Sequence, residues 1–189
     1  GCLGHGTGHT AIGECDRMIG YPARGGFCRL LLIPFVIFNL AAAQMSVADI
    51  TLQQANGESL SLSAPAKRII TLAPNLAELV FAAGAGEYLK AVVEYSNFPV
   101  EVTKIPRIGD AFRIDLERII ELRPDLVIAW KSGNPQTALK KLEQLGVTVW
   151  QIEITRPGKI ADAVENIAYA AGTEAVGQSA ARQLRSKLA

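Results

Sequence analysis

Residues 105–135 (IPRIGDAFRIDLERIIELRPDLVIAWKSGNP) constrain the fold of this chain more than any other segment. The continuous apolar run at positions 126–129 is typical of a strand that is covered on both faces of its sheet. A helical pattern that begins at Asp115 precedes this run, and Pro135, a favoured first residue of a helix, follows it. A buried strand between two helices predicts a parallel sheet in an α/β fold.

The strand in this segment ends at Trp130, in front of a polar loop that contains Gly133 and Asn134. Open α/β sheets bind ligands outside the carboxyl ends of their strands, so Trp130, Gly133 and Asn134 are candidate ligand-binding residues. The alternative for Trp130 is a place in the core, because tryptophan is highly buried on average. The polar residues after it favour a position at the rim of a site.

The rest of the chain alternates strands and helices with short connections. The pattern predicts strands at residues 68–72, 89–94, 126–130 and 147–152, and helices that begin near residues 75, 115, 135, 157 and 173. This order is typical of a doubly wound parallel sheet, which we assign to residues 64–172. Residues 49–63 alternate apolar and polar around Asn56-Gly57, which predicts a β-hairpin in front of it. The last helix, residues 173–189, has no C-cap, and we expect it to be the truncated start of a longer helix.

The N-terminal region has the pattern of a targeting segment. Basic residues precede an apolar run at residues 30–38, and small residues follow it. This order predicts a cleaved signal peptide at residues 18–43, with cleavage after Ala43 or, as second choice, after Ala48. The apolar run is shorter than the roughly 20 residues that a membrane-spanning helix needs. Residues 1–17 fit neither the leader nor the domain and stay unassigned.

All three cysteines and both histidines precede the expected cleavage site. The mature protein would therefore lack disulfides, a thiol nucleophile and a Cys/His metal site. The formal net charge of +1 over 189 residues gives no basic excess for binding nucleic acid. We therefore expect neither nucleic acid nor a metal ion as a partner, and no cofactor.

Four segments carry a resemblance to a known family: the hairpin, RIITLAPNLAELVFAAGAG, VEYSNFP and PRIGDAFRIDLERIIELRPDLVIAW. Together they resemble the periplasmic substrate-binding proteins of ABC importers for cobalamin, haem and iron–siderophores. The segments AWKSGNP and RIGDAFRIDLE are most similar to the cobalamin-binding branch. Members of this family have two Rossmann-like α/β lobes joined by one long helix, with the ligand between the lobes. By this resemblance the chain matches the first lobe and the start of the interlobe helix.

The resemblance also implies which loops line the ligand cleft. The implied contacts are Pro74, Asn75, Tyr95, Phe98, Ala111, Phe112, Arg113 and Trp130. Phe98 and Trp130 match aromatic ligand contacts, whereas Ala111 stands near a position where cobalamin binders can place a tryptophan. Glu117 matches the surface glutamate of the first lobe that docks onto arginines of the permease.

Several of these residues also have a purely structural interpretation. Phe98 and Phe112 can serve as anchors that pack their loops on the lobe. Asn75 and Asn134 are favourable helix N-caps, with Glu78 as the reciprocal partner of Asn75. Capping is the preferred interpretation of both asparagines, although a capping residue at the carboxyl end of a strand can still line a cleft.

Glu117 falls in the first turn of its helix, where a carboxylate interacts favourably with the helix dipole. The face formed by Leu116, Ile119 and Ile120 is expected to turn inward, which directs Glu117 to solvent. A metal cluster that includes Asp110 and Glu117 is disfavoured, because acidic residues in a loop and at a helix start are usually solvated or capping.

The preferred function is capture of cobalamin or a related corrinoid in the periplasm and its delivery to an ABC permease in the inner membrane. A monomer without catalytic residues suffices, and an apolar, aromatic cleft suits the large corrinoid faces. The alternatives within the family are a siderophore binder, for which only Arg113 and Lys131 supply positive charge, and a haem binder, for which only Tyr95 supplies an axial ligand. A nucleotide-dependent α/β enzyme is disfavoured, because LAPNLAE after the first strand has neither glycine-rich phosphate-binding pattern.

Overall fold

A computed structural model describes residues 49–188. The unassigned segment 1–17 and the expected signal peptide at residues 18–43 lie outside the described residues. A sheet of four strands runs through the described part in the order β4-β3-β5-β6, and each neighbouring pair is parallel. The strands are β3 (Ile69–Thr71), β4 (Leu89–Ala91), β5 (Leu126–Trp130) and β6 (Val149–Ile152).

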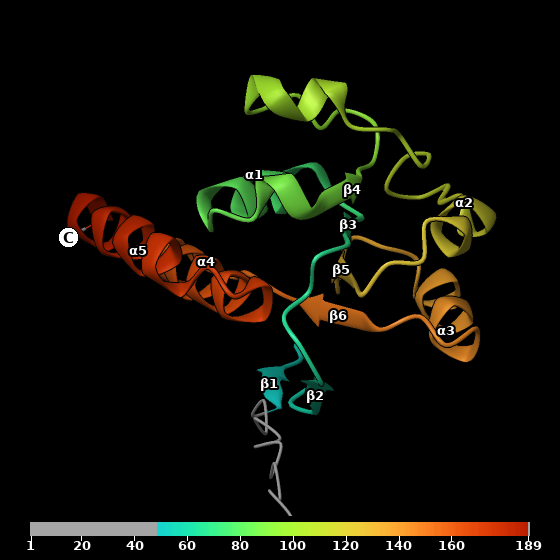
Figure 1. The fold of residues 1–189 in the computed structure, drawn as a ribbon, viewed down its shortest axis with the longest axis horizontal. Helices are drawn as coiled ribbons and strands as arrows, with labels where there is room; N and C mark the ends of the chain where they lie inside the picture. The colour runs from blue at the N-terminus through green and yellow to red at the C-terminus, as the bar shows by residue number, and fades with distance from the viewer. Residues whose placement is uncertain (1–48, 189) are drawn as a thin grey trace, which may run out of the picture. The chain divides into compact units, whose positions relative to one another are not determined.

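Helices cover both faces of this sheet (Figure 1). One face carries α1 (Pro74–Ala82) and α4 (Gly158–Ala171), with α5 (Glu174–Leu188) packed on α4. The other face carries α2 (Leu116–Glu121) and α3 (Gln136–Gln144). The short 3₁₀ helices η1 (Gly86–Tyr88) and η2 (Val100–Lys104) precede and follow β4. The doubly wound α/β fold predicted from the sequence is confirmed.

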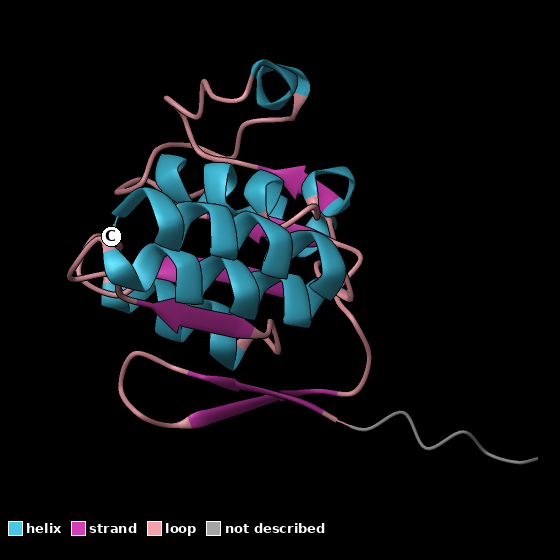
Figure 2. Cartoon of the chain, turned by 90° about the vertical axis from the view of Figure 1, so that its left-hand side faces the viewer, coloured by secondary structure: helices cyan, strands magenta, loops and turns pink. Residues whose placement is uncertain are grey.

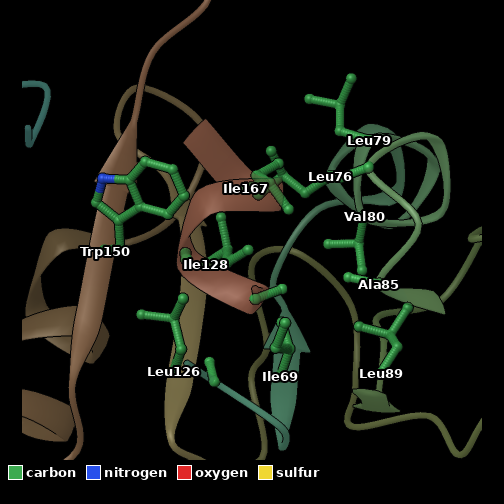
Figure 3. Packing of buried hydrophobic residues seen from close by; sticks show 14 of the residues in the cluster. Ile69, Leu76, Leu79, Val80, Ala85, Leu89, Leu126, Ile128, Trp150 and Ile167 are labelled. Carbon is green, nitrogen blue, oxygen red and sulfur yellow. The ribbon is translucent and has the colours of Figure 1, made fainter. Parts of the chain in front are cut away.

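Strand β5 has apolar neighbours on each face of the sheet. Leu126 and Ile128 pack with α1 and α4, together with Ile69 of β3 and Trp150 of β6, as Figure 3 shows. Val127 and Ala129 point the other way, into the cluster that includes residues of α2 and α3. This alternation within a wholly apolar run explains why the run has no polar face.

The antiparallel hairpin of β1 (Ile50–Gln53) and β2 (Ser59–Leu62) lies next to the sheet (Figure 2). Three hydrogen bonds tie it to β6, one of which the Gln151 amide donates to Gln54 Oε1 at 3.3 Å. The Trp150 indole Nε1 donates to the Gln53 carbonyl oxygen at 2.9 Å, and the Ala55 amide donates to the Gln151 carbonyl oxygen at 2.8 Å. Gly57 has a φ of 87°, the left-handed conformation that the predicted Asn-Gly turn requires. The predicted hairpin is therefore confirmed, and it covers part of an edge strand.

Helices α4 and α5 approach each other closely at Gly177. A Cβ at this position would lie 2.2 Å from the Cβ of Ala168, so the two backbones come together only because residue 177 has no side chain. Ala181, one turn further along α5, is also fully buried. Small residues thus set the distance between these helices.

Gly177→Ala should lower the free energy of unfolding by about 1–3 kcal/mol, because the added methyl group overpacks the contact with Ala168. At an exposed helix position the same change would stabilise the protein by about 1 kcal/mol. The sign of the change in unfolding free energy therefore tells whether residue 177 is closely packed. Urea denaturation measures the difference. Ser179→Ala, at an exposed site of α5, is the matched control and should change stability little. A stabilised Gly177→Ala variant would contradict the close packing of α4 and α5.

Candidate functional site

The carboxyl edge of the sheet contains a hollow of about 330 Å³ between three loops. Its lining residues are Ala73, Asn75, Ala111, Phe112, Trp130, Gly133 and Asn134. All of them except Ala73 are predicted ligand-binding residues. The strands of this sheet are parallel, so their carboxyl ends lie at one edge, and the loops that follow them meet there although they are far apart in the sequence.

A second hollow of about 440 Å³ adjoins the first at this edge. It is lined by Asn75, Glu78, Leu79, Trp130, Ile154, Thr155, Arg156, Pro157 and Ile160. Asn75 and Trp130 line both hollows, so the two adjoin at these residues and together make up the candidate site. Residues 154–157 were not predicted as site residues, although they follow β6 and ligands bind outside the carboxyl ends of such strands.

Hydrogen bonds hold Trp130 at both its main chain and its ring. The Trp130 amide donates to Asn134 Oδ1 at 2.7 Å, and the indole Nε1 donates to Ser132 Oγ at 2.9 Å. Gly133 lets the loop fold back over the ring, because a Cβ there would lie 3.2 Å from Trp130 Cδ1. The indole is half-buried and lines the site, as expected of a rim position.

Asn134 connects three segments of the edge. Its side chain is buried, and in addition to its bond with Trp130 its Nδ2 donates to the carbonyl oxygens of Leu72 at 2.8 Å and Ala111 at 3.0 Å. Pro135, not Asn134, occupies the N-cap position of α3, and it makes no side-chain cap bond. The N-cap interpretation of Asn134 is therefore wrong. Its side-chain oxygen accepts from the Trp130 amide and its nitrogen donates to two carbonyl oxygens, so the side chain does not cap α3.

The N-cap interpretation of Asn75 is also wrong. Helix α1 begins at Pro74, so Ala73 is the N-cap residue and Asn75 already lies in the first turn. Ala73 has no side-chain oxygen, and no side-chain cap bond forms there. A proline at the first helical position explains this start, since its fixed φ suits the helix and its missing N–H needs no partner.

A tight loop presents Phe112 at the rim. Gly109 has a φ of 91° and pairs with Ile114, which closes the loop. Asp110 Oδ1 accepts from the amides of Phe112 at 2.8 Å and Arg113 at 2.7 Å. These two bonds, that of Arg113 first, lower the pKa of Asp110 below its ordinary value of 3.8. Asp110 thus has a structural role in shaping this loop.

Four of the predicted contacts do not line either hollow. Tyr95 and Phe98 are 79% and 67% exposed, and neither they nor Pro74 and Arg113 line either hollow. One hydrogen bond holds the Tyr95–Phe98 loop: Arg107 Nη2 donates to the Ser96 carbonyl oxygen at 2.8 Å. Within the described residues, no group of three Asp, Glu, His or Cys side chains is placed to hold a metal ion.

Glu117 is exposed in the first turn of α2. Asp115 caps this helix, since its Oδ1 accepts from the Arg118 amide at 2.9 Å. The predicted inward face is correct for Ile119, which is fully buried, but wrong for Ile120, which is 40% exposed. A helix of six residues contacts the sheet through a narrow stripe, and Ile120 falls outside it.

Asn134→Asp should lower the free energy of unfolding by at least about 2 kcal/mol, because a carboxylate would face the carbonyl oxygens of Leu72 and Ala111 without a donor. Urea denaturation at neutral pH measures the loss. Asn97→Asp, the same change at an exposed loop position, is the control and should be nearly neutral. Equal stability of the two variants would contradict the connecting role of Asn134.

Comparison with known proteins identifies relatives of this chain. The Vitamin B12-binding protein of Vibrio cholerae is 42% identical over 124 residues, which cover 66% of this chain and 45% of the relative. The Vitamin B12-binding protein of Photorhabdus laumondii is 36% identical over 131 residues, which cover 69% and 48%. The chain spans about half the length of the curated relatives it matches.

Solved structures show the same fold. The crystal structure of the periplasmic vitamin B12 binding protein BtuF of Vibrio cholerae matches with a TM-score of 0.63 at 42% identity, over 66% of this chain and 49% of that one. The periplasmic heme-binding protein RhuT from Roseiflexus sp. RS-1 matches with a TM-score of 0.57 at 28% identity, over 65% and 47%. Residues 69–189, more than half of the chain, match the model of the family described as periplasmic binding protein. The chain belongs to the periplasmic binding protein family.

Proposed function

We propose that this chain provides a corrinoid-binding lobe of a periplasmic substrate-binding protein, which captures cobalamin and delivers it to an ABC permease. The observation that carries the proposal is Trp130, whose hydrogen-bonded ring lines both hollows at the carboxyl edge of the sheet. The identity to vitamin B12-binding proteins of two organisms supports the choice of ligand.

The chemistry of the edge suits a large, largely apolar ligand. The indole N–H of Trp130 already has Ser132 as its acceptor, so the ring offers the ligand its face and not a hydrogen-bond donor. Leu79, Ile154 and Ile160 add apolar surface beside it. A rigid aromatic residue supplies much contact area and loses little rotamer freedom on binding, which matches the broad faces of a corrinoid.

The same edge favours binding without catalysis. Among the residues that line the two hollows, Glu78 and Arg156 carry the only charges, and both belong to the second hollow. Residues 49–188 contain no histidine or cysteine that could serve as a general base or nucleophile. We infer a monomeric carrier located in the periplasm.

Haem is the second candidate ligand, because RhuT, a heme-binding protein, shares the fold at 28% identity. Tyr95 is the one tyrosine among the predicted contacts that could supply an axial ligand, but it is 79% exposed and lines neither hollow. Arg113 and Lys131, the charges considered for an anionic siderophore, are also outside both. Cobalamin needs no protein ligand to its already coordinated cobalt and remains the preferred choice.

Trp130→Ala should weaken cyanocobalamin binding by about 2 kcal/mol, or roughly 30-fold, as expected when an aromatic platform is lost from a desolvated site. Isothermal titration calorimetry of the chain, and of a fusion that adds the second half of the Vibrio cholerae relative, measures this. Tyr169→Ala removes an exposed aromatic ring of α4 outside both hollows and is the matched control.

Parallel titrations with haem and a ferric siderophore test the choice of ligand. Tight binding of either, with none of cyanocobalamin, would refute the corrinoid assignment. Unchanged cyanocobalamin affinity in Trp130→Ala would refute the role of the ring.

We also propose that Glu117 docks the lobe onto an arginine of the permease. Its carboxylate is exposed, and no hydrogen bond or ion pair to another described residue occupies it, whereas Glu121 of the same helix pairs with Arg118 at 2.9 Å. An exposed carboxylate adds little to the stability of the fold, but it can form a strong bidentate pair with a guanidinium across an interface.

Glu117→Ala in the fusion should leave the cyanocobalamin affinity and the melting temperature nearly unchanged, but it should reduce association with the permease in detergent or nanodiscs. Glu121→Ala, which removes a neighbouring carboxylate of α2, is the control and should associate normally. A Glu117→Ala variant that lost cyanocobalamin affinity and still associated normally would show that the docking assignment is wrong.

A further inference from the structure

A chain of hydrogen bonds links the Trp130 ring to Glu153, the residue directly after β6. Ser132 accepts from the indole Nε1 at 2.9 Å, and Ser132 is itself fixed by Glu153, which follows β6. The Ser132 amide donates to Glu153 Oε2 at 2.9 Å, and its hydroxyl donates to Glu153 Oε1 at 3.0 Å. Both carboxylate oxygens are therefore used to hold one serine.

This chain of bonds has a consistent direction. The serine hydroxyl donates its one proton to the carboxylate, so its oxygen lone pairs face the indole N–H as acceptor. A bond to an ionised carboxylate is stronger than one between neutral groups, which gives the chain a firm end point. The end point is itself held in place, because β6 pairs with β5 from Val127↔Val149 to Trp130↔Ile152.

We infer that Glu153, acting through Ser132, is a positioning residue that fixes the plane of the Trp130 ring before the ligand arrives. The inference rests on the proposed function, in which that ring is the ligand platform. It adds a residue that lines neither of the two hollows at the site. It also assigns a role to the residue directly after β6, for which the sequence predicted none.

The benefit of this arrangement is preorganisation. Immobilising a side chain on binding costs roughly 0.5–1.5 kcal/mol, which corresponds to about a 2- to 12-fold change in affinity. A ring that is already held incurs less of this cost when the ligand binds. Loss of Glu153 should thus weaken binding by about that factor and leave the fold intact, since Ser132 is exposed and Glu153 is only half-buried.

Indole N–H resonances test the inference directly. The chain has two tryptophans, and Trp130→Phe identifies which of the two indole peaks in a ¹H–¹⁵N spectrum belongs to Trp130. Ser132→Ala and Glu153→Ala should each shift that peak, speed its hydrogen exchange and leave the Trp150 peak in place. The Trp130 peak, followed through a cyanocobalamin titration, also reports the dissociation constant, which should rise about 2- to 12-fold in both variants.

A conservative variant and a matched control separate positioning from a general loss of charge. Glu153→Gln keeps one oxygen acceptor for the Ser132 amide and should shift the peak and the affinity less than Glu153→Ala does. Glu87→Ala removes an exposed carboxylate near β4 and should change neither. Melting temperatures within a few degrees of wild type show that each variant is folded.

Failure of the inference differs from failure of the proposed function. An unmoved Trp130 peak in Glu153→Ala would overturn the positioning role, and so would a moved peak with unchanged affinity. Both of these results leave cyanocobalamin binding by the wild-type chain in place. Absence of binding by the wild-type chain would instead overturn the proposed function, and the inference with it.

Discussion

Strand β5 is bounded on four sides, and the arrangement of the site depends on this. β3 and β6 pair with its two edges, while the helices of each face pack on its side chains. Its residues from Leu126 to Ala129 are fully buried, so a shift of the strand would disturb both apolar clusters at once. Trp130, the last residue of β5, therefore emerges at a defined point of the carboxyl edge.

Polar contacts then convert this defined point into a site. Asn134 joins the Trp130 amide to the ends of two other segments, at Leu72 and Ala111. A buried amide is stable in such a place only because its acceptor and both of its donors have partners. Three hydrogen bonds of Asn134 thus set the geometry of the edge. The bond to Trp130 is local, whereas Leu72 and Ala111 lie 62 and 23 residues away in the sequence.

The two tryptophans of the domain use their indole N–H groups for different contacts. Trp150 uses its indole N–H to hold Gln53, whereas Trp130 uses its own to bind Ser132 beside the site. The two tryptophans thus have different roles, since the first is buried in the core and the second is half-buried at the edge. Burial and hydrogen-bond partner, not residue type, separate a core tryptophan from a candidate ligand platform.

Local patterns in the sequence determined the parallel sheet, the hairpin at Asn56-Gly57 and the rim position of Trp130. Apolar periodicity and turn chemistry depend on near neighbours, so these features are readable from sequence alone. Only the tertiary structure decided which partners Asn134 and Glu153 take, because their hydrogen bonds join segments whose proximity no local pattern encodes. The same reason explains the wrong N-cap prediction for Asn134. The wrong N-cap at Asn75 has a local cause, since Pro74 takes the first helical position, and Ile120 is exposed because α2 is short.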